Sequence, residues 1–418
     1  MASQQETAAN AAPQHAKRWR IVAAAFVTMA HAPGLHYAYG TLMVALMEAN
    51  ISTSRALLGG VGSLSTGAML SGAYVSGRLQ SRFGAARVVA AGGAVAAAGL
   101  ALSAAATELW QLYVTFGLVV GLGHSLAFPP CPVAVAVAFS GSSDAALASG
   151  VATAGSGAGT VVLGVAARLL IVAAGWRATF GALALSTLVF VAGLAAPTLR
   201  GPQNRKPAAP VRETRPPQAP PLMTPRLRLL CGGVFVYAFG WEVPFVHLVA
   251  YAGDADHAAA AASLVVVFVG AGGSLGRVAV ARAADAKGVQ PTFRAMLLAT
   301  ALADAALPLV IDSIAACYAY ALVVGTTAGG CIALTTPMSC GCVAEGRLAE
   351  ASGAVFSSMA CGLVAGPFLA GVVYDVAGSY DAAFYGAAAL WLAAFGICRG
   401  LGDEASRDTP VEPPDDKL

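Results

Sequence analysis

The sequence predicts an all-α membrane protein with twelve transmembrane helices, arranged as two pseudo-symmetric halves of six helices each. The 418 residues are 57% hydrophobic and only 11% charged, less than half the charged share of a typical soluble domain. Mean hydropathy is +0.71, and the apolar segments are near or above the roughly 20 residues that cross a bilayer core. The 48 glycines fit helices that pack closely inside a membrane.

The apolar segments fall into two groups. A segment rich in proline and basic residues, 200–225, separates an N-terminal half, 20–199, from a C-terminal half, 226–402, and is predicted to be a cytosolic linker. Residues 1–19 and 403–418 are predicted to be tails, and the acidic second tail is expected to be disordered. The predicted spans are 20–46, 57–79, 86–106, 109–138, 146–173, 178–197, 227–251, 259–282, 292–311, 314–342, 350–373 and 382–400.

The distribution of charged residues predicts that both termini and the linker face the cytosol. Basic residues precede the first span, follow the second and eighth spans, and number seven between Arg200 and Arg228, whereas the connections on the other side are mostly acidic. Cytosolic loops of membrane proteins carry such an excess of Lys and Arg. The first span is expected to act as the targeting signal, and the expected host is the plasma membrane.

Several classes of function find no support in the sequence. The net charge of +3 is too small to indicate a nucleic-acid partner. The eight cysteines lie in or beside apolar segments, which favours buried small side chains over disulfides or a zinc site. With no nucleophile–base pair and no metal-ligand cluster in the sequence, we expect no enzyme activity, no metal and no cofactor.

An internal repeat relates the two halves. The segments 71–84 and 275–288 can be aligned at a constant offset of 204 residues, and each follows the second span of its half. This offset pairs Gly72 with Gly276, Arg78 with Arg282 and Gly84 with Gly288. Two related halves around a central midplane site are a common construction of secondary transporters.

At these loops the sequence resembles the major facilitator superfamily, whose loop pattern is Gly-x-x-x-Asp-Arg-x-Gly-x-Arg. Ser81 stands at the position of the acid in the first copy, and Ala281 replaces the first glycine in the second copy. The resemblance implies the major facilitator fold, with a gating or structural role for the residues that match. These are Gly77, Arg82, Gly84 and Arg87 in the first copy, and Asp285, Lys287 and Gly288 in the second.

Further motifs are similar to the monocarboxylate porter family, and they follow each other in that family's order along nearly the whole chain. They are Ala148–Gly159 at the fifth span, Gly175–Phe180 before the sixth, Val243–Ala252 in the seventh, and Gly366–Gly371 with Asp375, Gly378–Tyr380 and Ala383–Phe384 at the last corner. The resemblance implies a proton-coupled or exchanging carrier of monocarboxylates. The related oxalate–formate exchangers share much of the pattern.

Arg277 is the strongest candidate for substrate binding. It lies eight residues before Asp285, about 12 Å along a helix, and therefore inside the hydrocarbon zone. An unpaired cation there costs at least about 3 kcal/mol, so we expect the side chain to face a water-filled cavity. Its planar guanidinium fits a carboxylate through two parallel hydrogen bonds. The alternatives are an ion pair with a neighbouring helix, or a side chain that reaches the inner surface.

The family resemblance gives this arginine the role of substrate anchor, but it also reveals a departure. Monocarboxylate porters place an aspartate one turn before the arginine, and this chain has Gly273 there. They also place a lysine close to the segment around Pro33-Gly34 and His36, where this chain has none. A proton-symport mechanism identical to theirs therefore lacks its usual acid.

Glu242 is a candidate for the missing proton-coupling group, with His247 as its partner. Glu242 lies in the middle of the seventh span, where apolar surroundings favour the neutral form of a carboxyl group. Gly240 and Pro244 are expected to loosen the helix around it and to free backbone groups toward a cavity. The alternative is a structural ion pair or an interhelical hydrogen bond. Asp304 also lies in a span, and we expect a structural role for it.

His36, Tyr37 and His124 complete the predicted substrate site. His36 and Tyr37 follow Pro33-Gly34 in the first span, a pair of residues that should kink the helix. Imidazole and phenol groups can donate hydrogen bonds to a carboxylate or pass on a proton. Hydrogen bonding between helices is the alternative role for each.

The sequence thus favours a secondary active transporter of small organic anions, proton-coupled and working by alternating access between its two halves. Its partners would be a monocarboxylate, a proton or an exchanged anion, and the lipid bilayer. An anion exchanger of the oxalate–formate type is one alternative. A non-transporting membrane sensor built on a carrier scaffold is the other.

Overall fold

A computed structural model describes residues 2–52, 55–200, 222–255, 257 and 259–401, and every regular element in them is helical. Most of the predicted linker, 201–221, and the whole predicted tail 403–418 lie outside the described residues. The first helix begins at Ala2 and therefore includes residues of the predicted first tail, whose cytosolic location stays a prediction.

The first half contains the following elements: α1 (Ala2–His31), α2 (Pro33–Tyr37), α3 (Tyr39–Glu48), α4 (Arg55–Ser71), α5 (Ala73–Phe83), α6 (Ala85–Ala104), α7 (Leu109–Leu112), the π-helical η1 (Tyr113–Val120), α8 (Gly121–Ala127), α9 (Pro130–Ala138), α10 (Ala145–Ser186), the π-helical η2 (Thr187–Ala195) and α11 (Ala196–Thr198). The breaks between these helices have local causes. Proline cannot continue a helical hydrogen-bond ladder, and α2 begins at Pro33 and α9 at Pro130. The helical pattern of the first span is thus interrupted directly before Pro33, whereas its bend of 47° lies between Tyr37 and Tyr39.

The second half contains α12 (Pro225–Trp241), α13 (Val243–Asp254), α14 (Ala259–Lys287), α15 (Val289–Val310), α16 (Ile314–Cys340), the short 3-10 helix η4 (Glu345–Arg347), α17 (Leu348–Ala377) and α18 (Asp381–Arg399). The seventh span is broken at Glu242, which lies between α12 and α13, and Pro244 stands in the first turn of α13. The loosening predicted around Glu242 is thus a break in the helix.

The twelve predicted spans all fall on helices. By length and composition, eight helical stretches of the described residues qualify as membrane spans, or nine with the bent pair α1–α3. One stretch, Ala145–Thr198, holds two predicted spans, because the chain turns at Gly175 with φ 81° and ψ 169°. The remaining predicted spans coincide with α4–α5 and with α14.

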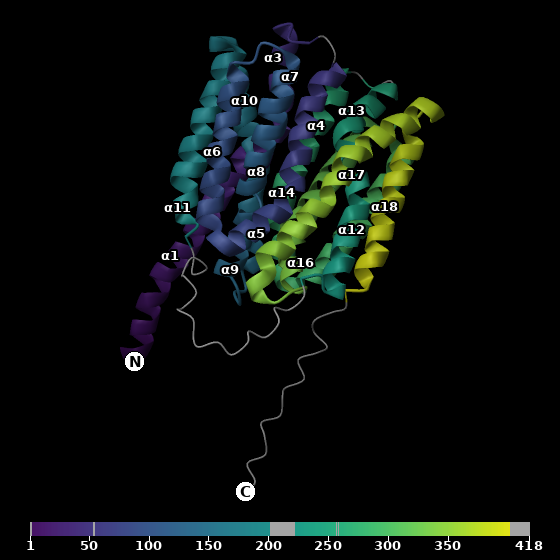
Figure 1. Cartoon of the computed structure of the whole chain (residues 1–418). Helices are drawn as coiled ribbons and strands as arrows, with labels where there is room; N and C mark the ends of the chain where they lie inside the picture. Colours follow the sequence, from purple (N-terminus) through teal and green to yellow (C-terminus); the bar gives the residue numbers. More distant parts are fainter. Residues whose placement is uncertain (1, 53–54, 201–221, 256, 258, 402–418) are drawn as a thin grey trace.

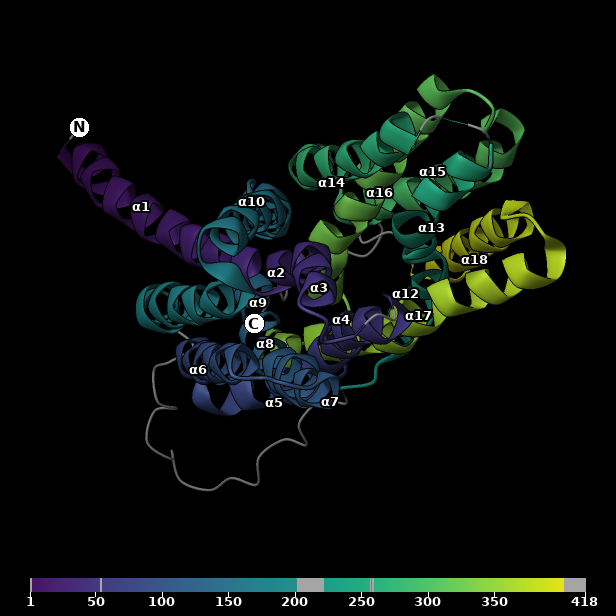
Figure 2. The ribbon, with the colours of Figure 1, turned by 90° about the horizontal axis from the view of Figure 1, so that it is seen from above.

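The helices form two bundles that meet along a central seam (Figures 1 and 2). Viewed from above, α1–α11 lie on one side and α12–α18 on the other. Contacts across the seam join α10 to α14 and α16, and join α4 and α5 to α17. The start of α1, the start of α12 and the end of α18 lie at the same end of the bundle in Figure 1, which we call the basic end because the loops with Arg82, Arg87 and Lys287 are there.

Both repeat loops turn in the same way. Gly84 has φ 82° and Gly288 has φ 93°, in the region of backbone conformation that favours glycine. These glycines are 204 residues apart and each starts the following helix, α6 and α15. The sequence repeat therefore has the same backbone turn in both halves.

Small residues on α10 let other helices approach closely. A Cβ atom at Gly155 or Gly159 would overlap the backbone of α1 at Phe26 or Ala30, and one at Gly157 would meet Ser274 of α14. The close-packing role expected for this stripe fits these contacts, in which backbone meets backbone.

Gly155→Ala should therefore destabilise the protein. The added methyl group meets the carbonyl of Phe26, and overpacking of this kind costs about 1–3 kcal/mol. Gly181→Ala is the control in the next span, beyond the turn at Gly175, because a Cβ atom there meets nothing within 4 Å; it should be neutral or gain up to about 1 kcal/mol. Thermal unfolding of both variants in detergent measures the difference, and equal midpoints would contradict the packing model.

Candidate functional site

A small cavity lies on the seam between the halves. Its volume is about 40 Å³, room for only two or three water molecules, so the site is nearly closed in this conformation. Tyr37, at 46% exposure, is the most exposed of the lining residues. The lining residues are Met29, Pro33, His36, Tyr37, Thr66, Met69, Leu70, Phe128, Thr153, Ser156, Trp241, Glu242, Arg277, Ile332, Phe356, Met359 and Leu363.

Arg277 brings a cation into this cavity without a counter-ion. The residue is 7% exposed, and its guanidinium donates one hydrogen bond, from an Nη atom to the carbonyl oxygen of Gly273 at 2.9 Å. The Nε atom is buried without a hydrogen-bond partner, and the described residues offer Arg277 no ion pair. A buried guanidinium left in this state is costly, so the site is electrostatically suited to an anion.

Gly273 explains why the charge is uncompensated. A Cβ atom placed there would lie 3.5 Å from the Arg277 Nη1 atom, so an acidic side chain at this position would lie next to the guanidinium. Glycine leaves that space empty and also lets α16 pack closely, because Gly329 sits against the Gly273 backbone. The departure noted in the sequence is therefore located beside Arg277.

Glu242 lines the same cavity from the break between α12 and α13. It is partly buried, and no hydrogen bond or ion pair is recorded for its carboxyl group within the described part of the chain. Tyr37 lies within electrostatic range of both Glu242 and Arg277, on the opposite half of the protein. The structure thus brings together Arg277, Glu242 and Tyr37, three of the residues selected from the sequence.

His36 also lines the cavity. Its hydrogen-bond partners can accommodate both the neutral and the charged form of the imidazole ring. Its Nδ1 atom lies 2.9 Å from the carbonyl oxygen of Ala32, so Nδ1 carries a proton. Its Nε2 atom lies 2.8 Å from the Ser65 hydroxyl, which lies 3.0 Å from the Phe116 carbonyl oxygen. Ser65 can donate to a neutral ring, or accept from a charged ring and donate to Phe116.

Two of the predicted site residues do not reach the cavity. His124 is fully buried behind His36, with ring centroids 5.0 Å apart, and neither of its ring nitrogens has a partner. His247 contacts the Pro367 carbonyl oxygen at 2.9 Å and the Tyr380 hydroxyl at 3.3 Å. The expected pairing of His247 with Glu242 is therefore absent, and the contacts of His247 tie α13 to α17 and to the start of α18.

Sequence reasoning missed the apolar part of the site. Apolar side chains from both halves, methionines and aromatic residues among them, cover most of its wall, with Trp241 next to Glu242. Thr153 and Ser156 of α10 add hydroxyl groups. The proximity of Trp241 to the helix break was the available signal, whereas the methionines look like any other membrane-span residues. Asp304, in contrast, lies outside the cavity, where it accepts a hydrogen bond from Tyr320 at 2.7 Å, as its expected structural role requires.

At the basic end, Asp285 connects the two halves. Its carboxylate accepts hydrogen bonds from the backbone amides of Ala146 at 2.8 Å and Leu147 at 2.7 Å. These are unpaired amides in the first turn of α10, where a helix favours negative charge. Nearby, the Ser149 hydroxyl donates to the Ala333 carbonyl oxygen at 2.9 Å. The cavity is therefore closed toward the basic end.

The other motif residues have simpler surroundings. A Cβ atom at Gly77 would overlap the backbone of Ala349, so this glycine lets α5 approach α17. Arg82 is exposed and lies over the ring of Phe83, 5.3 Å from its centroid. Arg87 and Lys287 are also exposed.

Comparison with known proteins agrees with this architecture. The family model of the Major Facilitator Superfamily matches residues 24–233 and again residues 230–416, once for each half. The chain belongs to this superfamily. The Major Facilitator Superfamily is a family of membrane transporters and not of enzymes, so the protein is an integral, multi-pass membrane transporter.

Curated relatives agree with the predicted resemblance to monocarboxylate porters, which is confirmed. Human monocarboxylate transporter 11 is 30% identical over 400 residues, which cover 92% of this chain and 82% of that protein. Rat monocarboxylate transporter 13 is 27% identical over 419 residues, covering 96% and 94%.

Solved structures confirm the major facilitator fold. The human organic anion transporter MFSD10 matches with a TM-score of 0.71 and 19% identity, over 91% of this chain and 99% of that one. The fucose:proton symporter of E. coli matches with a TM-score of 0.69 and 13% identity, over 92% and 98%.

Removal of the Asp285 cap should open the basic end. In Asp285→Asn the bidentate carboxylate is lost, so two charge-assisted hydrogen bonds between the halves weaken, each worth about 1.5–3 kcal/mol. A cysteine introduced by Ser149→Cys, at a position 1% exposed on the seam, should then react faster with a maleimide. Lys287→Gln, at an exposed position two residues away, is the control. An unchanged rate in Asp285→Asn would show that the cap does not hold this end closed.

Proposed function

We propose that this transporter is a secondary active carrier of small organic anions, with monocarboxylates as the substrate class. The observation that carries the proposal is the Arg277 guanidinium, which is buried in the seam cavity without a counter-ion. A substrate carboxylate would supply the missing charge through the fork of the guanidinium. The mostly apolar remainder of the wall suits a substrate with one charged group and a hydrophobic body.

The transport mechanism that we propose is alternating access. The two halves meet at the cavity, and the cross-seam hydrogen bonds described above, those of Asp285 and Ser149, lie toward the basic end. Breaking those contacts while forming others at the opposite end would expose the cavity to the other side of the membrane. We exclude an ATP-driven pump because of the superfamily to which the chain belongs, and because the sequence has no phosphate-binding loop.

A coupling partner is needed for uptake, and we propose a proton carried by Glu242. Moving one negative charge into a negatively charged interior costs about 2.3 kcal/mol per 100 mV, and a cotransported proton cancels that charge. Glu242 shares the cavity with Arg277 and has no cation partner among the described residues. The hydrogen bonds of His36, which suit either the neutral or the charged ring, lie on the opposite half of the protein. Exchange of one anion for another is the alternative, and it needs no titrating group.

The orientation that we propose places the basic end in the cytosol, in accordance with the positive-inside rule. Both termini and the linker 200–225 would then be cytosolic, and the host membrane would be the plasma membrane.

Arg277→Ala should abolish transport of carboxylates. In proteoliposomes that contain purified protein, counterflow of a panel of labelled monocarboxylates should fall at least about 100-fold, since the loss of a buried charge pair costs about 3–5 kcal/mol. Arg282→Ala is the matched control, because Arg282 lies on the same helix and is exposed. If Arg277→Ala retains counterflow of the monocarboxylate that the wild-type protein carries, the guanidinium is not the anchor. If the wild-type protein carries no member of the panel, the substrate class is wrong.

Glu242→Gln should separate proton symport from exchange. With acid outside the liposomes, the wild-type protein should accumulate the substrate, whereas Glu242→Gln should lose this acid-driven uptake but keep exchange of labelled for unlabelled substrate. Glu48→Gln, at an exposed position on α3, is the control. Uptake that ignores the acid gradient in the wild-type protein, while exchange persists, would establish an anion exchanger.

A further inference from the structure

The two repeat loops at the basic end are built alike but terminated differently. At the repeat offset of 204 residues, Asp285 corresponds to Ser81. At the same offset Ala146, whose backbone amide Asp285 caps, corresponds to Glu350 in the first turn of α17. The loop of the first half lies against α17, because a Cβ atom at Gly77 would overlap the backbone of Ala349. The repeat therefore predicts that a carboxylate at position 81 would cap α17, as Asp285 caps α10.

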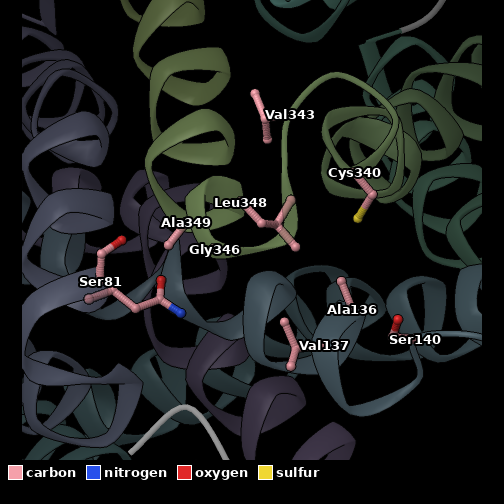
Figure 3. Close-up of a pocket in the computed structure, with 10 residues that line it drawn as sticks. Ser81, Ala136, Val137, Ser140, Cys340, Val343, Gly346, Leu348 and Ala349 are labelled. Atoms are coloured by element: carbon pink, nitrogen blue, oxygen red, sulfur yellow. The ribbon is translucent and has the colours of Figure 1, made fainter. Parts of the chain in front are cut away.

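This cap is missing. The Ser81 hydroxyl donates to the Gly77 carbonyl oxygen of its own helix at 3.1 Å, and the N-cap residue of α17, Arg347, makes no side-chain capping hydrogen bond. A pocket of about 490 Å³ opens at this position. Figure 3 shows Ser81 and Ala349 on one side of it, Cys340 across from them, and Ala136 and Val137 of α9 below, with Ser140 just after that helix. The remaining lining residues are Gln80, Val343, Gly346 and Leu348.

Gln80 is an independent sign that this pocket takes a ligand. The residue is 3% exposed and lines the pocket, yet neither the nitrogen nor the oxygen of its side-chain amide has a hydrogen-bond partner. A buried amide without partners costs about 1–3 kcal/mol per lost group. A ligand that accepts a hydrogen bond from the Gln80 nitrogen would remove part of that cost.

The charge of the surroundings selects an anion. The pocket meets the N-terminus of a helix of 30 residues, which carries partial positive charge and unpaired amides. None of the ten lining residues named above is acidic. Glu350, in the same turn, is already paired with Arg347 at 2.5 Å.

We propose that this pocket binds a small carboxylate anion that takes the place of the acid missing at position 81. The carboxylate accepts hydrogen bonds from the first-turn amides of α17, from the Gln80 amide and from the Ser81 hydroxyl. Bound there, it links α5 of one half to α17 of the other and stabilises the conformation closed at the basic end. The site is separate from the Arg277 cavity, so it regulates the transporter and does not carry substrate.

Cys340 offers a direct test. Its thiol is exposed and lines the pocket, whereas Cys361 is exposed but lies outside it. The full chain in detergent is treated with N-ethylmaleimide in sodium succinate or in sodium chloride of equal ionic strength, and the modified peptides are quantified by mass spectrometry. Labelling of Cys340 should slow about tenfold at ten times the dissociation constant of succinate, with no change at Cys361. Equal rates at Cys340 in the two salts would overturn the proposal.

Three variants locate the effect. Ser81→Asp supplies the carboxylate, so Cys340 should label slowly in both salts, whereas the uncharged Ser81→Asn should still respond to succinate. Gln80→Leu should need about tenfold more succinate, the change expected for loss of one charge-assisted hydrogen bond. Identical behaviour of Ser81→Asp and Ser81→Asn, or full succinate sensitivity in Gln80→Leu, would overturn the assignment.

Arg277→Ala distinguishes the two sites. Protection of Cys340 should persist in this variant although carboxylate counterflow is lost. If protection disappears together with counterflow, succinate acts through the central cavity, and the pocket at Ser81 is not a separate site.

Discussion

A single uncompensated guanidinium accounts for most of what is unusual in this structure. Arg277 lies in the middle of the membrane-spanning bundle, where the Gly273 carbonyl is its one hydrogen-bond acceptor among the described residues. A charge in that position is tolerated only beside a polar cavity, and the helices around it are arranged to provide one. Pro33 interrupts the first span and lines this cavity from the first half, whereas Glu242 interrupts the seventh span and lines it from the same half as Arg277.

The fold was largely predictable because a bilayer imposes simple rules on a sequence. The length of the apolar segments predicted the helices. The basic loops predicted that the ends of both halves lie on the same side of the membrane. Glycines at a fixed offset gave the repeat, as the shared positive φ angles of Gly84 and Gly288 show. What these rules could not give was the local helix geometry inside the spans. The π-helical segments η1 and η2 depend on local packing and not on hydropathy.

The site was predictable where it contains charge and unpredictable where it does not. Arg277 and Glu242 stood out because ionisable residues are rare in membrane spans. His124 and His247 stood out for the same reason but make other contacts, because a sequence does not show which face of a helix a side chain occupies. Trp241, Thr153 and the methionines were missed, since each is an ordinary residue for a packed helix. The cap made by Asp285 needed coordinates, because its partners are backbone amides 138 and 139 residues away.

The break at Glu242 makes α13 a lever. The helix has 12 residues, about 18 Å in length, so a tilt of about 5° at Glu242 moves its far end by about 1.6 Å. That arm is fastened to α17 and to the start of α18 through His247, at Pro367 and Tyr380. A change of charge or geometry at Glu242 is therefore passed along α13 to α17 and to the start of α18.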